Sequence, residues 1–211
     1  MPSARQIVSR SPHRRAGRIV CPWFQDTPIE YESLLERDFV RLALLDLVLS
    51  SVTHQPFILK LQELGSYIPD YLLCGAKGRV VVEVKPEKYA ANSRHGPRLQ
   101  RAEKLLREQD CRFLLATEKT IRNGMRHERA AILLRHARSH LTDELRAYIL
   151  ASAAKFADGV TIGELASSAG VPKTAILHLI GRRLLRINDA LHFDDSQLVF
   201  PIGGQNGDLH P

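Results

Sequence analysis

The sequence is poor in cysteine and lacks any long hydrophobic run. Its three cysteines, Cys21, Cys74 and Cys111, are widely separated, and this odd, scattered set argues against a disulfide framework and against a zinc site. No apolar run approaches the roughly 18–20 residues that a membrane span requires. The first twenty residues contain five arginines and no continuous apolar stretch, so they do not indicate a secretory signal. We therefore expect a protein of the reducing cytoplasm.

The net charge of +7 is unevenly distributed along the 211 residues. Five arginines and two acids give residues 1–30 a charge of +3, and thirteen bases and five acids give residues 88–140 a charge of +8. Residues 31–87 and 141–211 each hold six bases and eight acids, for −2. The basic segments would attract a nucleic-acid backbone. A solvated basic face without a partner explains the charge equally well, so both interpretations stay open.

The hydrophobic pattern predicts an α/β (α+β) domain in residues 31–140. Residues 1–30, rich in Arg, Ser and Pro, predict a basic N-terminal arm in an extended conformation. Helical spacing begins at Tyr31, and the two glycines of GAKG favour a hairpin turn. A mixture of helices and strands in this order is typical of a mixed sheet flanked by helices. The expected elements are a helix from 31, strands at 56–61, 67–74 and 79–84, a helix at 97–109, a strand at 111–117 and a helix ending near 139.

Residues 141–211 predict a second, smaller domain. After a connecting helix come the capping pair Thr161 and Glu164, a helix break at Gly170, and Pro172, which can open the next helix. Two short helices around a glycine turn, followed by a hairpin, are typical of a winged helix-turn-helix. Its basic residues could contact DNA. Aspartates occupy the expected wing, however, so we favour docking to a partner protein.

The strand RVVVEVKP carries the strongest chemical signal. Alternation along a strand puts Glu83 and Lys85 on one face, and Asp70, just after Pro69, lies where a hairpin partner would approach Glu83. Two converging carboxylates repel each other unless a cation neutralises them. Carboxylate oxygens suit Mg²⁺, and Lys85 could orient or deprotonate an attacking water while stabilising charge on a phosphate. The pattern predicts a metal-dependent site for phosphodiester cleavage.

A structural interpretation competes with this catalytic one. An isolated E-x-K sequence is common on strands, where Glu83 and Lys85 would form an exposed salt bridge and Asp70 would be a turn residue. The preceding helix adds two acids, Glu32 and Glu36, which share a face at i,i+4 spacing. Most acids on a helix are merely solvated. The joint occurrence of the helix acid, the P-D sequence and the valine-rich E-x-K strand favours catalysis.

The combined pattern resembles that of the PD-(D/E)xK nuclease superfamily, through its P-D and E-V-K sequences. More closely, the segments YESLLERDF, IPDYLL and VVVEVKP, in this order and spacing, resemble TnsA, the endonuclease subunit of heteromeric cut-and-paste transposases. The similarity runs from about Gly17 to Thr117, and continues more loosely through the C-terminal region. It implies a restriction-endonuclease-like fold in residues 31–140.

The resemblance also implies which residues are catalytic. The family's helix acid falls on Glu36, its metal-binding aspartate on Asp70, its strand acid on Glu83 and its lysine on Lys85. We expect Asp70, Glu83 and the Val84 carbonyl to bind Mg²⁺, for which Mn²⁺ substitutes. Glu36 would be near enough to influence this ion or to hold a second one.

A division of labour with partners follows from the same resemblance. TnsA-like subunits cleave the 5′, non-transferred strand at transposon ends, while a TnsB-like transposase cuts and joins the 3′ ends and a TnsC-like ATPase regulates them. In the basic block, Arg94, Arg98 and Arg101 are the expected contacts to double-stranded DNA. The chain would thus act at the bacterial nucleoid. It contains no P-loop, so ATP chemistry belongs to a partner.

Two other functions stay open. The chain could be another PD-(D/E)xK nuclease, such as a resolvase or a restriction enzyme, although a stand-alone restriction enzyme would need no docking module. It could also be a non-catalytic helix-turn-helix DNA-binding regulator on a degenerate nuclease scaffold. The complete acidic set argues against that interpretation.

Overall fold

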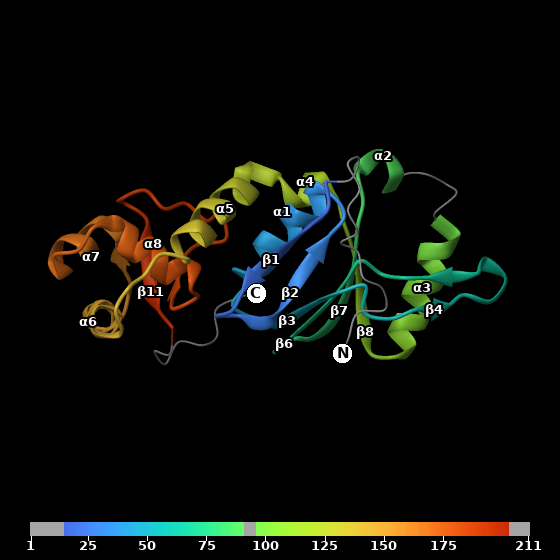
Figure 1. Ribbon diagram of the computed structural model, residues 1–211, viewed down its shortest axis with the longest axis horizontal. Coiled ribbons are helices and arrows are strands. Elements are labelled where there is room, and N and C mark those ends of the chain that lie inside the picture. Colours follow the sequence, from blue (N-terminus) through green and yellow to red (C-terminus); the bar gives the residue numbers. More distant parts are fainter. Residues whose placement is uncertain (1–14, 91–95, 203–211) are drawn as a thin grey trace. The chain divides into compact units, whose positions relative to one another are not determined.

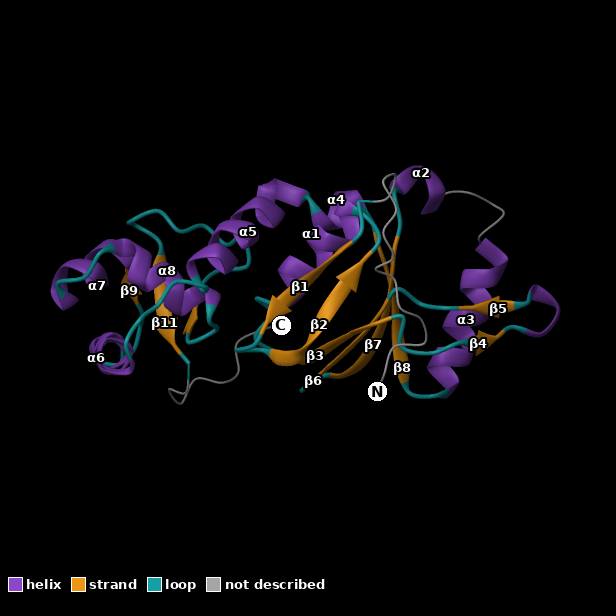
Figure 2. Cartoon of the chain, viewed as in Figure 1, coloured by secondary structure: helices purple, strands orange, loops and turns teal. Residues whose placement is uncertain are grey.

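The computed structural model describes residues 15–90 and 96–202, which form a mixed α/β structure as expected from the sequence. The chain divides into two compact units between Asn123 and Gly124, and Figures 1 and 2 show the elements of both. The sequence pattern, by contrast, predicts a boundary after residue 140. Among the described residues, no helix is both long enough and apolar enough to cross a membrane.

An antiparallel hairpin is the first element of the described chain. Strand β1 (Gly17–Cys21) pairs with β2 (Gln25–Tyr31). Ile19, Cys21 and Ile29 are buried, so the ribbon contributes apolar side chains to the core of the first unit. Residues 17–31 are therefore a paired ribbon, where the composition predicts an extended arm.

Helix α1 (Leu34–Ala43) is fixed at its start by Ser33, whose hydroxyl accepts the backbone N–H of Glu36. This is the usual N-cap arrangement. The helical spacing in the sequence continues to Leu45, but the helix ends at Ala43 because the chain turns at Asp46, whose carboxylate accepts a backbone N–H two residues on. Strand β3 (Leu49–His54) follows, earlier than the strand predicted at 56–61.

A four-stranded mixed sheet forms the centre of the first unit, in the order β3-β6-β7-β8. Strands β3, β6 (Tyr71–Gly75) and β7 (Gly78–Val84) are antiparallel neighbours, whereas β8 (Cys111–Ala116) runs parallel to β7. The predicted GAKG turn joins β6 to β7, with Gly75 paired to Gly78. Gly78 has a positive φ of 92°, which glycine adopts without a steric cost.

One side of this unit is closed by a small ribbon and a long helix. The ribbon pairs β4 (Leu59–Lys60) with β5 (Ser66–Tyr67), and α3 (Gly96–Glu108) coincides closely with the predicted helix at 97–109. Their apolar side chains pack with Val81 into a buried cluster that includes Leu61, Tyr67, Ala102 and Leu106. Two short helices, α2 (Glu87–Ala90) and α4 (Glu118–Ile121), follow β7 and β8.

The second unit contains four helices among its described residues and a small three-stranded sheet. Thr142 caps α6 and Thr161 caps α7 through their hydroxyls, as the sequence predicted for Thr161. The sheet order is β10-β11-β9, with antiparallel pairs. The elements are α5 (Arg126–His136), α6 (Asp143–Ala153), β9 (Val160–Thr161), α7 (Ile162–Ala169), α8 (Lys173–Gly181), β10 (Leu185–Arg186) and β11 (Leu198–Pro201).

Candidate functional site

The hairpin of β6 and β7 brings Asp70 next to the end of β7. Tyr71 pairs with Val82 in the antiparallel register, so the next position along places Asp70 across from Glu83. One carboxylate oxygen of Asp70, Oδ2, accepts the backbone N–H of Val84 at 2.7 Å. The N–H and C=O of a strand residue point to the same side, so the Val84 carbonyl is also directed toward the Asp70 side of the strand.

Glu83 is held at both of its carboxylate oxygens. The ammonium Nζ of Lys85 lies 2.5 Å from Oε1, and the Tyr67 hydroxyl donates to Oε2 at 2.6 Å. Glu83 is only 4% exposed, and its side chain and that of Lys85 lie on the same face, as strand alternation predicted. A buried acid that pairs with an amine does not fit the exposed salt bridge of the structural interpretation.

Burial and the close approach of several carboxylates shift the pKa values of Asp70 and Lys85. Burial, and then the charge of Glu83, raise the pKa of Asp70 to about 8, against the opposing hydrogen bond from Val84. Burial alone would lower the pKa of Lys85, but the carboxylates of Glu83, Asp70 and Glu36 outweigh it and raise that pKa above its usual value. Lys85 is therefore a persistent cation beside crowded carboxylates.

Glu36 contributes to the same field from α1. Burial raises its pKa, and the charge of Glu83 adds to this, although two hydrogen bonds oppose it. Its Oε1 accepts the Ser33 hydroxyl at 2.8 Å and its Oε2 accepts the backbone N–H of Glu32 at 2.7 Å. Glu36 is therefore held at the start of α1 by two hydrogen bonds, and its charge acts on Asp70 and Lys85.

Two tyrosines complete the site, and sequence reasoning missed both. Tyr67, 7% exposed, donates to Glu83, and burial followed by the charge of Glu83 raises its pKa far above the usual value. Tyr71 is buried against Phe39 of α1, with ring centroids 5.5 Å apart, and burial and then the Glu36 charge raise its pKa. An aromatic residue on a strand predicts packing, so no signal in the sequence indicates these hydroxyls.

The three arginines predicted to contact DNA have different positions. Arg98 on α3 is partly buried and donates to the backbone carbonyl of Ser66, next to Tyr67. Its charge acts on the Tyr67 hydroxyl, so it lies near the carboxylate site. Arg101 is partly buried one turn further along α3. Arg94 lies outside the described residues.

The donor set at this site fits a hard divalent cation. Asp70, Glu83 and the Val84 carbonyl offer oxygen atoms only, which Mg²⁺ and Mn²⁺ accept. Burial and then the Glu83 charge raise the pKa of Asp70, and a cation bound beside its carboxylate would oppose both effects. Across residues 15–90 and 96–202, no group of three or more His, Cys, Asp or Glu side chains is arranged to hold a metal. Any ion would rest on two acids and a main-chain oxygen.

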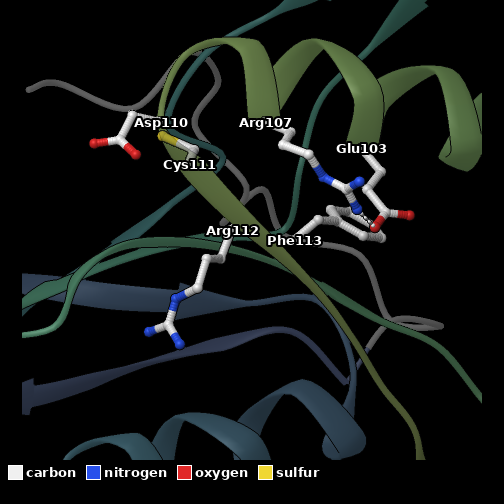
Figure 3. A pocket seen from close by; sticks show the side chains of 6 residues that line it. All are labelled: Glu103, Arg107, Asp110, Cys111, Arg112 and Phe113. Carbon is white, nitrogen blue, oxygen red and sulfur yellow. Dashed lines mark hydrogen bonds and ion pairs between the residues drawn. The ribbon is translucent and has the colours of Figure 1, made fainter.

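A cavity of about 280 Å³ lies elsewhere in the first unit (Figure 3). It is lined by the end of α3 and the start of β8, where Arg107 pairs with Glu103. Arg79 of β7 pairs with Cys111 at that end, whereas the Lys85 N–H bonds to Ala116 at the other. About five residues of strand, roughly 16 Å, separate the two ends, so this cavity is not part of the carboxylate site.

Comparisons with known proteins do not assign this site. No family model matches the chain. No curated protein matches its sequence either. The function therefore has to be argued from the residues themselves and their geometry.

Proposed function

We propose that this protein is a Mg²⁺-dependent DNA endonuclease that hydrolyses phosphodiester bonds. The observation that carries the proposal is the convergence of Asp70, Glu83 and Lys85 at one end of β6 and β7, with the charge of Glu36 acting on them from α1. Crowded carboxylates beside a fixed amine are costly for the fold. They match the requirements of a site that binds a cation and a phosphate.

The catalytic roles follow from these positions. Asp70, Glu83 and the Val84 carbonyl would hold Mg²⁺, or Mn²⁺ in its place, and Glu36 would add negative charge from α1 or hold a second ion. When bound, the cation supplies Lewis-acid polarisation of the scissile phosphate. Glu83 is kept in place by Tyr67, and the Val84 N–H fixes one oxygen of Asp70, so the ligands are oriented before substrate arrives.

Lys85 stabilises the negative charge that develops on the phosphate. Its raised pKa keeps it protonated near neutral pH, which favours this electrostatic role over proton abstraction from water. Its ion pair with Glu83 fixes the ammonium beside the proposed ligands. DNA entering the site would share this ammonium with Glu83.

Within this class, we favour the TnsA-like endonuclease subunit of a heteromeric transposase. Such a subunit would cleave the 5′ strand at transposon ends, with a TnsB-like transposase acting on the 3′ ends and a TnsC-like ATPase as regulator. The order of the sequence segments supports this choice. The mixed sheet, with the acids on β6 and β7 and a helix acid on α1, agrees with the restriction-endonuclease-like fold that this family would need.

The second unit suits a winged helix-turn-helix that docks a protein. Helices α7 and α8 flank Gly170, which has a positive φ of 63°, and the small sheet follows the order that a wing would need. Lys173, at the start of α8, forms an ion pair of 2.7 Å with Asp195. This pairing lowers the positive charge that α8 could offer to DNA, which supports docking of a partner.

Strand cleavage at transposon ends tests the proposed function. Duplexes carrying the ends would be incubated with this chain, with and without its transposase partner, and with Mg²⁺ present or withheld. We expect cuts on the 5′ strand that require Mg²⁺. Cuts on the 3′ strand only, or cleavage that ignores Mg²⁺, would contradict the proposal.

A further inference from the structure

Asp38 of α1 is the centre of an arginine cluster apart from the carboxylate site. It is 1% exposed. Its Oδ1 accepts from Nε and Nη2 of Arg37, at 3.3 and 3.0 Å, and lies 3.5 Å from Nη1 of Arg41. Its Oδ2 accepts from Nε and Nη2 of Arg122, at 3.1 and 2.9 Å. One buried carboxylate therefore organises three guanidinium groups.

The cluster carries more positive charge than its aspartate can neutralise. Three guanidinium groups and one carboxylate leave a net charge of +2. The side chains of Arg37, Arg41 and Arg122 remain 29%, 28% and 43% exposed. For Arg37 and Arg122, the hydrogen bonds to Asp38 leave the Nη1 amino group outside the ion pair. Guanidinium groups that keep donor atoms outside their ion pair, and that one carboxylate holds together, suit the oxygens of a phosphate.

The position of the cluster relates it to the candidate site within the first unit. Arg37 directly follows Glu36 on α1, and Arg122 ends α4, which packs against α1 (Figure 1). Helix α4 begins after β8, at the end where the Ala116 carbonyl accepts the Lys85 N–H. The arginines and the carboxylates thus come from elements that meet at the same end of the sheet.

We propose that Arg37, Arg41 and Arg122 form a phosphate clamp that holds the backbone of duplex DNA beside the cleavage site. This inference rests on the proposed function for its ligand. It adds DNA-binding residues that the net charge along the sequence did not predict. Arg37 and Arg41 lie in the segment 31–87, which is acidic overall. Asp38 is the positioning residue, since it fixes the three guanidinium groups before DNA arrives.

The test is the salt dependence of DNA binding without divalent cations, measured on the full chain with a short fluorescent duplex. Removing one arginine that binds a phosphate should flatten the slope of log K against log salt by about 0.9. Between about 50 and 200 mM salt, this changes the fall in affinity by about threefold per arginine. We expect this effect for Arg37→Ala and for Arg41→Ala, and about twice the change in slope for the double variant.

Two controls separate the clamp from other roles of these arginines. Arg112→Ala removes one exposed positive charge at the opposite end of the sheet and should leave the slope unchanged. The double lysine variant of Arg37 and Arg41 keeps the charge and should keep the slope. Unfolding of each variant by urea shows whether α1 and α4 have come apart.

Specific outcomes would overturn the clamp. If both alanine variants keep the wild-type slope but unfold at lower urea concentration, the cluster only holds α1 and α4 together. If Arg112→Ala flattens the slope equally, the effect comes from the net charge of the protein and not from this cluster. Because the assay contains no Mg²⁺ and measures no cleavage, a chain that binds through the cluster but never cuts would disprove the nuclease and leave the clamp in place. If the chain cuts DNA but the arginine variants keep the wild-type slope, the clamp is disproved and the nuclease stands.

Discussion

The carboxyl group of Asp70 should make the stability of the metal-free protein depend on pH. In an unfolded chain its pKa is near 3.8, whereas burial and then the Glu83 charge raise it to about 8 in the fold. Between these values the folded state binds more protons than the unfolded state, so unfolding free energy falls as pH rises through about 8. Above that pH, Asp70 is ionised in the fold and the repulsion between its carboxylate and that of Glu83 is fully present.

Asp70→Asn should remove this pH dependence, because the amide oxygen can still accept the Val84 N–H without carrying charge. Relative to this variant, we expect metal-free wild type to lose roughly 4 kcal/mol between about pH 5 and pH 9. Urea unfolding at both pH values measures it. Mg²⁺ should restore this stability at the higher pH in wild type only. Parallel pH profiles of the two proteins would refute the raised pKa.

The Tyr67 hydroxyl should control how well Glu83 serves as a metal ligand. Tyr67→Phe keeps the ring in the apolar cluster but removes the 2.6 Å hydrogen bond. We expect a stability loss of roughly 1–3 kcal/mol, because the buried Glu83 carboxylate loses a hydrogen-bond donor. The apparent affinity for Mg²⁺ should fall about tenfold, as for other partners of metal ligands. Mg²⁺ titration monitored by thermal unfolding measures this, with Tyr89→Phe, whose residue is exposed, as the control. An unchanged Mg²⁺ affinity would make Tyr67 a packing residue.

At the scale of helices and strands, the sequence predicted the elements whose pattern is local. Strand β7 is rich in valine and follows a glycine turn, and α3 and β8 lie within a residue or two of their expected bounds. Strand β3 was not predicted, because LSSVTH buries only Val52 and His54, too few to show a pattern. Of the strand predicted at 56–61, only Leu59–Lys60 (β4) is a strand. The β1–β2 ribbon was missed for the same reason, since β2 buries only Ile29.

The packing of α5 on α8 depends on Gly181. A Cβ atom built at this position would lie 2.3 Å from the Leu133 carbonyl oxygen and 2.9 Å from the Ala137 Cβ. Gly181→Ala should therefore push the two helices apart and cost about 1–3 kcal/mol. Urea unfolding of the second unit measures it. Equal stability of Gly181→Ala and wild type would contradict the close approach.

At the scale of the whole molecule, the candidate site was predictable because its acids follow the strand register. Asp70, Glu83 and Lys85 could be placed together from alternation and one hairpin turn. Tyr67 and Arg122 could not, since they reach the site or its neighbourhood from β5 and α4, whose positions depend on tertiary packing. The sequence predicted the acids and the lysine on the strands, but not the side chains that hydrogen-bond to them or lie near them.

The division of the chain after Asn123 predicts how it can be shortened. Helix α5 buries Ala130 and Leu133 and packs on α8, so a chain that ends after residue 141 keeps α5 without its partner and should aggregate. A chain that ends at Asn123 should stay monomeric and keep its stabilisation by Mg²⁺. Gel filtration and thermal unfolding measure both. The opposite pattern would place the boundary near residue 140.

Nicking of supercoiled plasmid DNA tests the central claim most directly. Four proteins would be compared with Mg²⁺ or Mn²⁺: wild type, Asp70→Asn, Lys85→Ala and Lys77→Ala. Lys77 is exposed in the turn that joins β6 to β7 at the opposite end of the strand from Lys85, so its substitution removes the same charge away from the site. We expect wild type and Lys77→Ala to nick the plasmid, and at least roughly a hundredfold less nicking by the other two. No nicking by wild type, or equal nicking by Asp70→Asn, would contradict the assignment of this site to DNA cleavage.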